Sequence, residues 1–278
     1  MLGGALGHLM GNIGPTLGGD PEALHQMRIA VRDSRAVLQL FEPHLDAAVA
    51  GRFTEGLRRL GGIVGGARDW DVFCLETLST AWPDLSTERL EDLNAAAEVE
   101  RQLAHEVVAD TLRGRDFTAL VLGLATWAEA GARAPSALGD ERMGERLRLL
   151  APSLLDCAAA RVKRRARHAS RLSALKRHRL RKSLKKLCFD IESFAGIYRP
   201  RAARAYLFRC EALERILGVA NDAAVTGRLA LKLATASRPD LANPARALTR
   251  WSGRRGRDAL RGLKPALKDF RAAPAFWS

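Results

Sequence analysis

Two segments of this chain combine a histidine with basic side chains at the three- and four-residue spacing that places residues on one face of a helix. In the first segment, HQMRIAVRDSR, these residues are His25, Arg28, Arg32 and Arg35. At about 100° of rotation per residue, they occupy less than about a third of the helix circumference. Few acidic side chains share this face, so ion pairs between helical turns would leave most of its charge in place. A row of cations about 15 Å long predicts binding to a string of anionic groups, although a solvated basic face would show the same spacing.

The second segment, HRLRKSLKK, repeats the first at an offset of 153 residues and carries His178, Arg181 and Lys185 at the corresponding positions. A further pair of segments, residues 60–72 and 213–225, matches at the same offset. Because two matches far apart in the chain share one offset without a gap, we predict an internal duplication. Its simplest structure is a pair of similar helical bundles packed about a pseudo-two-fold axis.

The charge of the chain is strongly positive and uneven. Its 278 residues include 45 Lys and Arg against 31 Asp and Glu, a net charge of +14. Residues 1–139 carry 12 basic and 19 acidic residues, a net of −7, and residues 140–278 carry 33 and 12, a net of +21. A balance of this kind favours a polyanionic partner, which could be a nucleic acid, an anionic membrane surface or a phosphate polymer.

The densest basic run is residues 161–186, which contains 13 Lys or Arg and no acidic residue. Like charges at this density repel one another and are typical of interaction surfaces. A disordered basic linker is the alternative. Apolar residues at helix-compatible positions, among them Val162, Leu172 and Leu180, favour a helical surface instead.

The two histidines are open to two roles. Each could donate a hydrogen bond to a phosphate, as a cation beside the anion, or tie its helix to a neighbouring one. We do not expect metal binding, because neither His25 nor His178 has a carboxylate or cysteine at ligand spacing. The four cysteines have no CxxC spacing, which is typical of the core of a reduced, cytoplasmic protein.

Helical periodicity dominates the chain, so we predict an all-α fold. Asp20-Pro21-Glu22 has the pattern of an N-cap, a first-turn proline and an acidic first turn. The glycines at 65 and 66 predict the end of a helix, with Asp69 as the N-cap of the next one and Asp222 in the same role in the second repeat. The predicted helices lie near residues 21–41, 45–64, 69–80, 86–113, 115–131, 141–170, 174–196, 201–217, 222–236 and 244–270. We place the linker at 133–140, between a first repeat, 1–139, and a second, 140–278.

Several classes of protein do not fit the sequence. It has no run of about 18 apolar residues and no signal peptide. It has no glycine-rich phosphate loop of the Walker type, and the acidic pair Glu98 and Glu100 lies in a helical segment, so we do not expect an enzyme. No helix-turn-helix, RRM or zinc-finger pattern is visible, and no aromatic residue interrupts the basic run. Non-specific binding of nucleic acid through phosphates remains the alternative function.

Three sets of motifs resemble the CHAD family, the conserved-histidine α-helical domain. They are HQMRIAVR with HRLRKSLKK, LRRLGGIVGGARDWDV with LERILGVANDAAV, and the terminal WSGRRGRDALRGLKPALKDFRAAPAFW. The resemblance covers nearly the whole chain. It implies two pseudo-symmetric helical bundles with a basic cavity or pore between them that binds inorganic polyphosphate. It implies no catalysis and no cofactor. In bacteria such domains stand alone or follow a triphosphate tunnel enzyme domain, and they associate with polyphosphate granules, so granule proteins are possible partners.

By position, the resemblance implies a set of polyphosphate-binding residues from both repeats and from the preceding basic helix. The set is His25, Arg28, Arg32 and Arg35; His178, Arg181, Lys182 and Lys185; and Arg161, Arg164, Arg165 and Arg171. The chain departs from the family pattern at Asp33, Ser34 and Cys188, where basic or apolar residues are usual. Because the first half is acidic, we expect an asymmetric site in which the second repeat dominates.

Overall fold

The computed structural model describes residues 1–42, 45–85, 90–133, 140–167, 172–235 and 237–277, and for 131–133 and 140–146 it describes the backbone alone. This part of the chain is helical and contains no strand, which confirms the predicted all-α class. None of its helices is both long enough and apolar enough to cross a membrane. The chain forms two compact units: residues 1–134 with 229–247, and residues 135–228 with 248–278.

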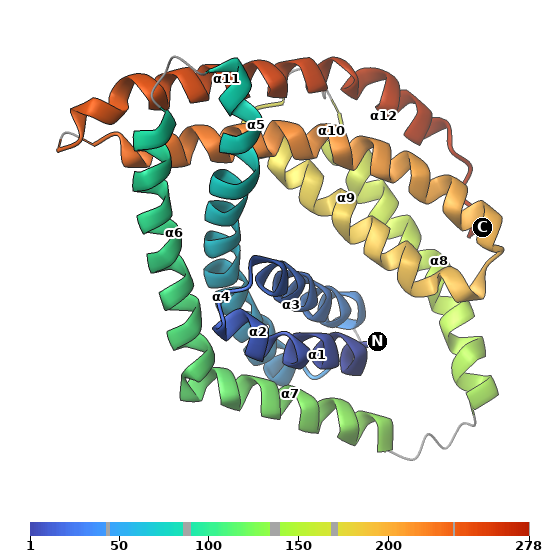
Figure 1. Ribbon diagram of the computed structural model, residues 1–278. Coiled ribbons are helices and arrows are strands. Elements are labelled where there is room, and N and C mark those ends of the chain that lie inside the picture. The colour runs from blue at the N-terminus through green and yellow to red at the C-terminus, as the bar shows by residue number, and fades with distance from the viewer. Residues whose placement is uncertain (43–44, 86–89, 134–139, 168–171, 236, 278) are drawn as a thin grey trace. The chain divides into compact units, whose positions relative to one another are not determined.

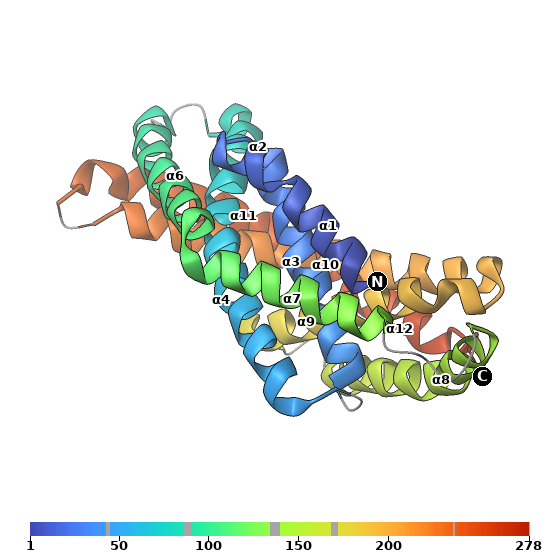
Figure 2. The same ribbon diagram turned by 90° about the horizontal axis from the view of Figure 1, so that it is seen from below.

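The first unit is a helical bundle centred on two long helices, α3 and α4. Its elements are α1 (Leu2–Gly11), α2 (Ile13–Leu17), α3 (Pro21–Phe41), α4 (Ala47–Asp71), a π-helix (Val72–Leu78), α5 (Ser79–Ala81), a 3₁₀ turn (Trp82–Asp84), α6 (Leu90–Arg113) and α7 (Arg115–Arg133). Helix α3 packs against α1 and α4, and α4 packs against α6 (Figure 1). Helix α7 crosses α4 and lies beside α1 (Figure 2).

The second unit is built from the remaining helices. These are α8 (Asp140–Arg165), α9 (Ala174–Phe194) with a 3₁₀ turn (Ala195–Ile197), α10 (Pro200–Leu233), α11 (Ala242–Arg261) and α12 (Leu263–Ala272). Helices α8 and α9 lie side by side, and α10 runs along α11 and α12 (Figure 1). The end of α10, a 3₁₀ turn (Pro239–Leu241) and the start of α11 belong to the first unit.

The start of α3 follows the sequence prediction. Asp20 is the N-cap, and its side chain accepts a hydrogen bond of 2.9 Å from the backbone nitrogen of Glu22. Downstream, Met27 and Val31 are almost fully buried on the core face. The cap fixes where the helix begins, and burial of its apolar face decides which side chains border the core.

The predicted breaks at the glycines are wrong. Helix α4 continues through Gly65 to Asp71, and α10 continues through Gly218. Asp69 and Asp222 therefore lie inside helices and are not N-caps. Helix α4 packs along α3, and such packing outweighs the cost of roughly 1 kcal/mol that a glycine brings to a helix. Each glycine lies beside an arginine of the neighbouring helix: a Cβ on Gly65 would stand 3.8 Å from Nε of Arg28, and one on Gly218 would stand 4.0 Å from Nε of Arg181, both ordinary van der Waals contacts.

A buried carboxylate joins α4 to α6. The Oδ1 atom of Asp71, fully shielded from solvent, lies 2.8 Å from Nε2 of His105 and 3.3 Å from Nη1 of Arg101. Glu98 pairs with the same arginine at 2.6 Å. A buried charge is stable only when it is paired in this way. The acidic motif RDWD therefore supplies a structural ion pair that fixes α6 beside α4.

The close approach of α10 and α11 yields a stability prediction. A Cβ on Gly256 would stand 2.9 Å from the Cβ of Ala223 and 3.6 Å from the backbone of Ala220. We expect Gly256→Ala to lower the free energy of unfolding by about 1–3 kcal/mol, because the two backbones would have to separate. Gly66→Ala is the control, since nothing lies within 4 Å of that position, and we expect it to stabilise α4 by up to about 1 kcal/mol. Urea unfolding of both variants measures the two effects. Equal effects would show that the helix contact is not tight.

Candidate polyanion-binding faces

The first basic face consists of His25, Arg28, Arg32 and Arg35 on α3. Helix α4 approaches this face with glycines, so the arginines lie over its backbone. Arg28 lies over Gly65, and Nη1 of Arg35 is 3.8 Å from where a Cβ of Gly61 would stand. The histidine and both of these arginines are half-buried. Their positive ends are therefore held against the protein and do not extend freely into solvent.

Two donors on this face have no hydrogen-bond partner in the described part of the chain. They are Nδ1 of His25 and Nε of Arg35, and both atoms are buried. A buried donor without a partner costs free energy, and in native proteins it calls for an explanation such as a ligand. The first face is therefore incomplete as a purely structural arrangement.

Crowded positive charge surrounds these donors. The pKa of His25 is lowered by burial and then by the charge of Arg68 and of Arg28. The pKa of Arg35 is lowered by burial and by the nearby Arg58. Since an arginine stays protonated, this direction means that its charge is less well stabilised in the protein than in water. An anion at the face would reverse both effects.

Arg68 is a member of this environment that the predicted set omitted. It lies on α4, three residues after Gly65, and its Nη2 is 2.7 Å from Glu76. Its side chain is 14% exposed. The signal in the sequence was the position of this arginine one helical turn after a glycine that faces α3.

Arg32 differs from the other members of the first face. Its Nε lies 2.9 Å from Oδ1 of Asp33, so the acidic residue that departs from the family pattern neutralises part of the face. The arginine is about half exposed. A pair this open to solvent is weak, and an incoming anion can compete for the guanidinium.

The second basic face consists of His178, Arg181, Lys182 and Lys185 on α9. Arg181 lies over Gly218 of α10, and its Nε is buried without a partner in the described residues. Lys185 pairs with Glu214 of α10 at 3.2 Å, and Lys182 is exposed. The contact of an arginine with a glycine therefore recurs at the predicted offset of 153 residues.

The two histidines are held differently. Nδ1 of His178 donates a hydrogen bond of 2.8 Å to Oδ1 of Asn221 on α10. Asn221 occupies the position that Arg68 occupies in the first repeat. His178 therefore has the role of tying α9 to its neighbour, which was one of the two possibilities, and its other ring nitrogen is left for further contacts. For His25 no such tie is present at Nδ1.

The basic helix that precedes α9 places Arg161, Arg164 and Arg165 near its C-terminal end, all exposed. Nη1 of Arg165 donates a hydrogen bond of 2.9 Å to the backbone oxygen of Arg179. The pKa of Arg165 is lowered by burial and by the charges of Arg161, Arg164 and Arg179. We call Arg161, Arg164 and Arg165 of α8, together with Arg179 of α9, the α8 cluster. The predicted residue Arg171 lies outside the described residues.

A buried acid lies behind the second face. Asp190 is 1% exposed, and its Oδ1 is 3.1 Å from Nζ of Lys186. Burial raises the pKa of Asp190 to about 6, while the charges of Lys186 and Arg161 act in the opposite direction. The effect of desolvation on the pKa of Asp190 thus outweighs the effect of two neighbouring cations.

Comparisons with known proteins identify the family and the fold. The sequence profile of the CHAD domain matches residues 1–231. The crystal structure of the CHAD domain from the plant Ricinus communis superposes with a TM-score of 0.81 and 28% sequence identity, covering 99% of this chain and 91% of that one. The structure of PptA from Streptomyces chartreusis has a TM-score of 0.62 and 17% identity, with 97% of each chain covered, and so shares the fold. A search of curated proteins gave no match.

The raised pKa of Asp190 predicts a pH dependence of stability. The folded chain binds the proton of this acid more tightly than the unfolded chain, so the residue stabilises the fold most below pH 4, and this contribution is lost as the pH rises through about 6. We expect the free energy of unfolding of the wild type, relative to Asp190→Asn, to fall by about 3 kcal/mol between pH 4 and pH 7. Urea titrations of both proteins across this range measure the difference. A difference that stays constant with pH would contradict the assignment.

Proposed function

The chain belongs to the CHAD domain family, and from this premise we propose that its basic faces bind inorganic polyphosphate without catalysing a reaction. The observation that carries the proposal is the crowding of cationic side chains against the protein, with buried nitrogens of His25, Arg35 and Arg181 that have no partner among the described residues. Arg35 illustrates it, because burial and then the neighbouring Arg58 lower its pKa. A bound polyanion would relieve this repulsion.

The form of the faces favours a linear phosphate polymer. The cations of each face follow one another at three or four residues along a helix, which is a rise of about 5 Å per cation. A polymer with a negative charge on every phosphate can place an anion against each of them. Arginine suits this contact because its planar fork can donate two parallel hydrogen bonds to phosphate oxygens.

Nucleic acid is the competing ligand. The residues of the two faces and of the α8 cluster include no aromatic side chain, so the surfaces that stack single-stranded bases are missing from them. Contacts to a nucleic acid would be limited to its phosphates and would be non-specific. We therefore propose that nucleic acids bind only weakly at physiological salt.

We propose a binding role and not an enzymatic one. The acidic residues that resemble a catalytic pair are engaged in ion pairs: Glu98 with Arg101, and Glu100 with Lys232. We propose that the protein binds polyphosphate without a cofactor or a metal. It would act in the cytoplasm and be recruited to polyphosphate granules through the polymer itself.

The first test compares neutral substitutions on the two faces. We expect Arg181→Gln/Lys182→Gln to weaken polyphosphate binding by about ten-fold or more, because two charge-assisted phosphate contacts are lost. Arg28→Gln/Arg35→Gln should lose less affinity for polyphosphate, because we expect the second face to dominate binding. Binding of labelled long-chain polyphosphate at near-physiological salt measures these affinities.

The matched control is Arg201→Gln/Arg204→Gln, which removes the same charge from exposed positions at the start of α10. It should leave the affinity nearly unchanged. Unlabelled duplex DNA, RNA and orthophosphate serve as competitors. Equal competition by DNA, or equal losses in the control and second-face variants, would mean that the chain is a general basic surface and would overturn the proposal.

His25 predicts a pH dependence of binding. Its pKa in the free protein is below the usual 6.5, and a bound polyanion favours the protonated ring, so the pKa should rise on binding. The affinity should therefore fall as the pH rises from below the pKa of His25 in the free protein to above its pKa in the complex. Between pH 5 and 8 we expect the wild type to lose about ten-fold more affinity than His25→Gln. Parallel affinity curves for the two proteins would exclude a protonated His25 from the site.

A further inference from the structure

We propose that a groove in the first unit, between α4 and the corner where α6 meets α7, binds a small anionic amphiphile: a molecule with an apolar body and one phosphate, sulfate or carboxylate group. The groove has a volume of about 820 Å³, within the range of small-molecule sites. None of its lining residues belongs to the first basic face, so the inference is independent of polyphosphate binding.

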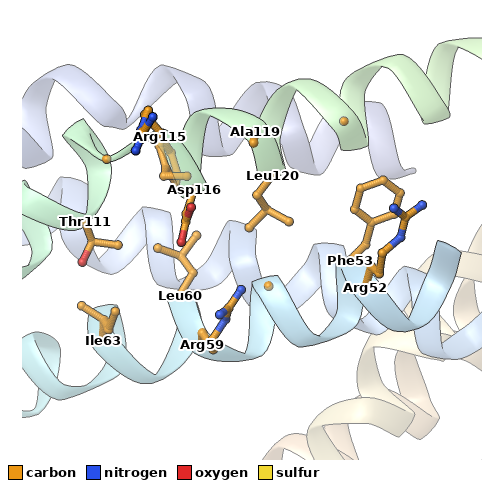
Figure 3. A pocket seen from close by; sticks show the side chains of 14 residues that line it. Arg52, Phe53, Arg59, Leu60, Ile63, Thr111, Arg115, Asp116, Ala119 and Leu120 are labelled. Atoms are coloured by element: carbon orange, nitrogen blue, oxygen red, sulfur yellow. The ribbon is translucent and has the colours of Figure 1, made fainter. Parts of the chain in front are cut away.

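The floor of the groove is apolar. Phe53, Leu60 and Ile63 rise from α4, and Leu120 points from α7 towards them (Figure 3). The buried ring of Phe117 completes the lining. An apolar floor of this kind favours a hydrocarbon or aromatic body over water or a bare phosphate chain.

The rim of the groove is cationic. Arg52 and Arg59 flank the floor on α4, and Arg115 stands at the start of α7 (Figure 3). In the described structure none of these three arginines has an acidic partner within ion-pair distance. Asp116 is the one acid among the lining residues, so the lining keeps a net charge of +2. An anionic group at the rim, with its apolar body on the floor, matches both surfaces.

The walls of the groove depend on two glycines. A Cβ on Gly56 would stand 2.7 Å from Cδ1 of Leu120, and one on Gly123 would stand 3.2 Å from Cε1 of Phe53. Any larger side chain at Gly123 would thus have to share the space beside the Phe53 ring. The open volume exists because neither position carries a side chain.

The second repeat carries a smaller pocket at the corresponding positions. It has a volume of about 510 Å³ and is lined by Ala205, Phe208, Arg209, Asp269 and Ala272. At an offset of 153 residues, Ala205 and Ala212 stand where the first repeat has Arg52 and Arg59. The two rim arginines on α4 are therefore a feature of the first repeat.

The experiment uses the fluorescent anion 8-anilinonaphthalene-1-sulfonate, with dodecyl phosphate as a competitor and dodecyltrimethylammonium as its cationic counterpart. We expect saturable binding of the dye that dodecyl phosphate displaces and the cation does not. Gly123→Phe, which places a ring beside Phe53 in the groove, should weaken dye binding by at least about ten-fold. Long-chain polyphosphate should leave the bound dye in place.

A pair of surface variants keeps the test independent of packing changes. Arg52→Gln/Arg59→Gln removes rim charge at exposed positions and should weaken dye binding by about ten-fold. Arg58→Gln is the control, because Arg58 pairs with Glu55 at 2.6 Å and does not line the groove; it should bind as the wild type does. Unchanged binding in both groove variants, equal competition by the cationic detergent, or displacement by polyphosphate would each overturn the proposal. None of these outcomes bears on whether the basic faces bind polyphosphate.

Discussion

The close approach of a glycine-bearing helix to an arginine-bearing helix is the constraint on which the basic faces depend. Gly65 of α4 lies against Arg28 of α3, and Gly218 of α10 lies against Arg181 of α9. Each arginine therefore lies beside the neighbouring helix, at van der Waals distance from where a Cβ of the glycine would stand. Its charged end is held at the helix contact and does not extend freely into solvent. The packing of α3 on α4 thus places the cations of the first face.

This placement has a cost for folding. Burial and neighbouring cations lower the pKa values of His25, Arg35 and Arg165. Each shift means that the charged form is less stable in the folded chain than in water. Proteins accept such a cost at sites where a ligand offsets it. The buried Asp71 links α4 to α6, whereas the pair of Asp190 with Lys186 lies within α9.

The two predicted repeats carry different side chains at corresponding positions. In the first, Arg32 is partly neutralised by Asp33, and Arg68 adds charge beside the histidine. In the second, Asn221 replaces that arginine and binds the histidine, and Cys188 takes the place of Arg35. The groove of the first unit differs from its counterpart in the same way, because Ala205 and Ala212 stand where the first repeat has Arg52 and Arg59. The internal duplication stays a prediction, and under it the charged side chains have diverged between the two repeats.

The sequence by itself determined the all-α class and the start of α3 at the Asp20 cap. Periodicity and the Asp20 cap depend on residues a few positions apart, so a short window contains the information. Only the tertiary structure decided what depends on a second helix. It showed that Gly65 lies beside Arg28, that Asp71 is paired with His105 from a distant segment, and that Asn221 binds His178 while Nδ1 of His25 has no partner among the described residues. The physical reason is that a glycine, an acid or a histidine has many possible partners in sequence, and close packing selects one of them.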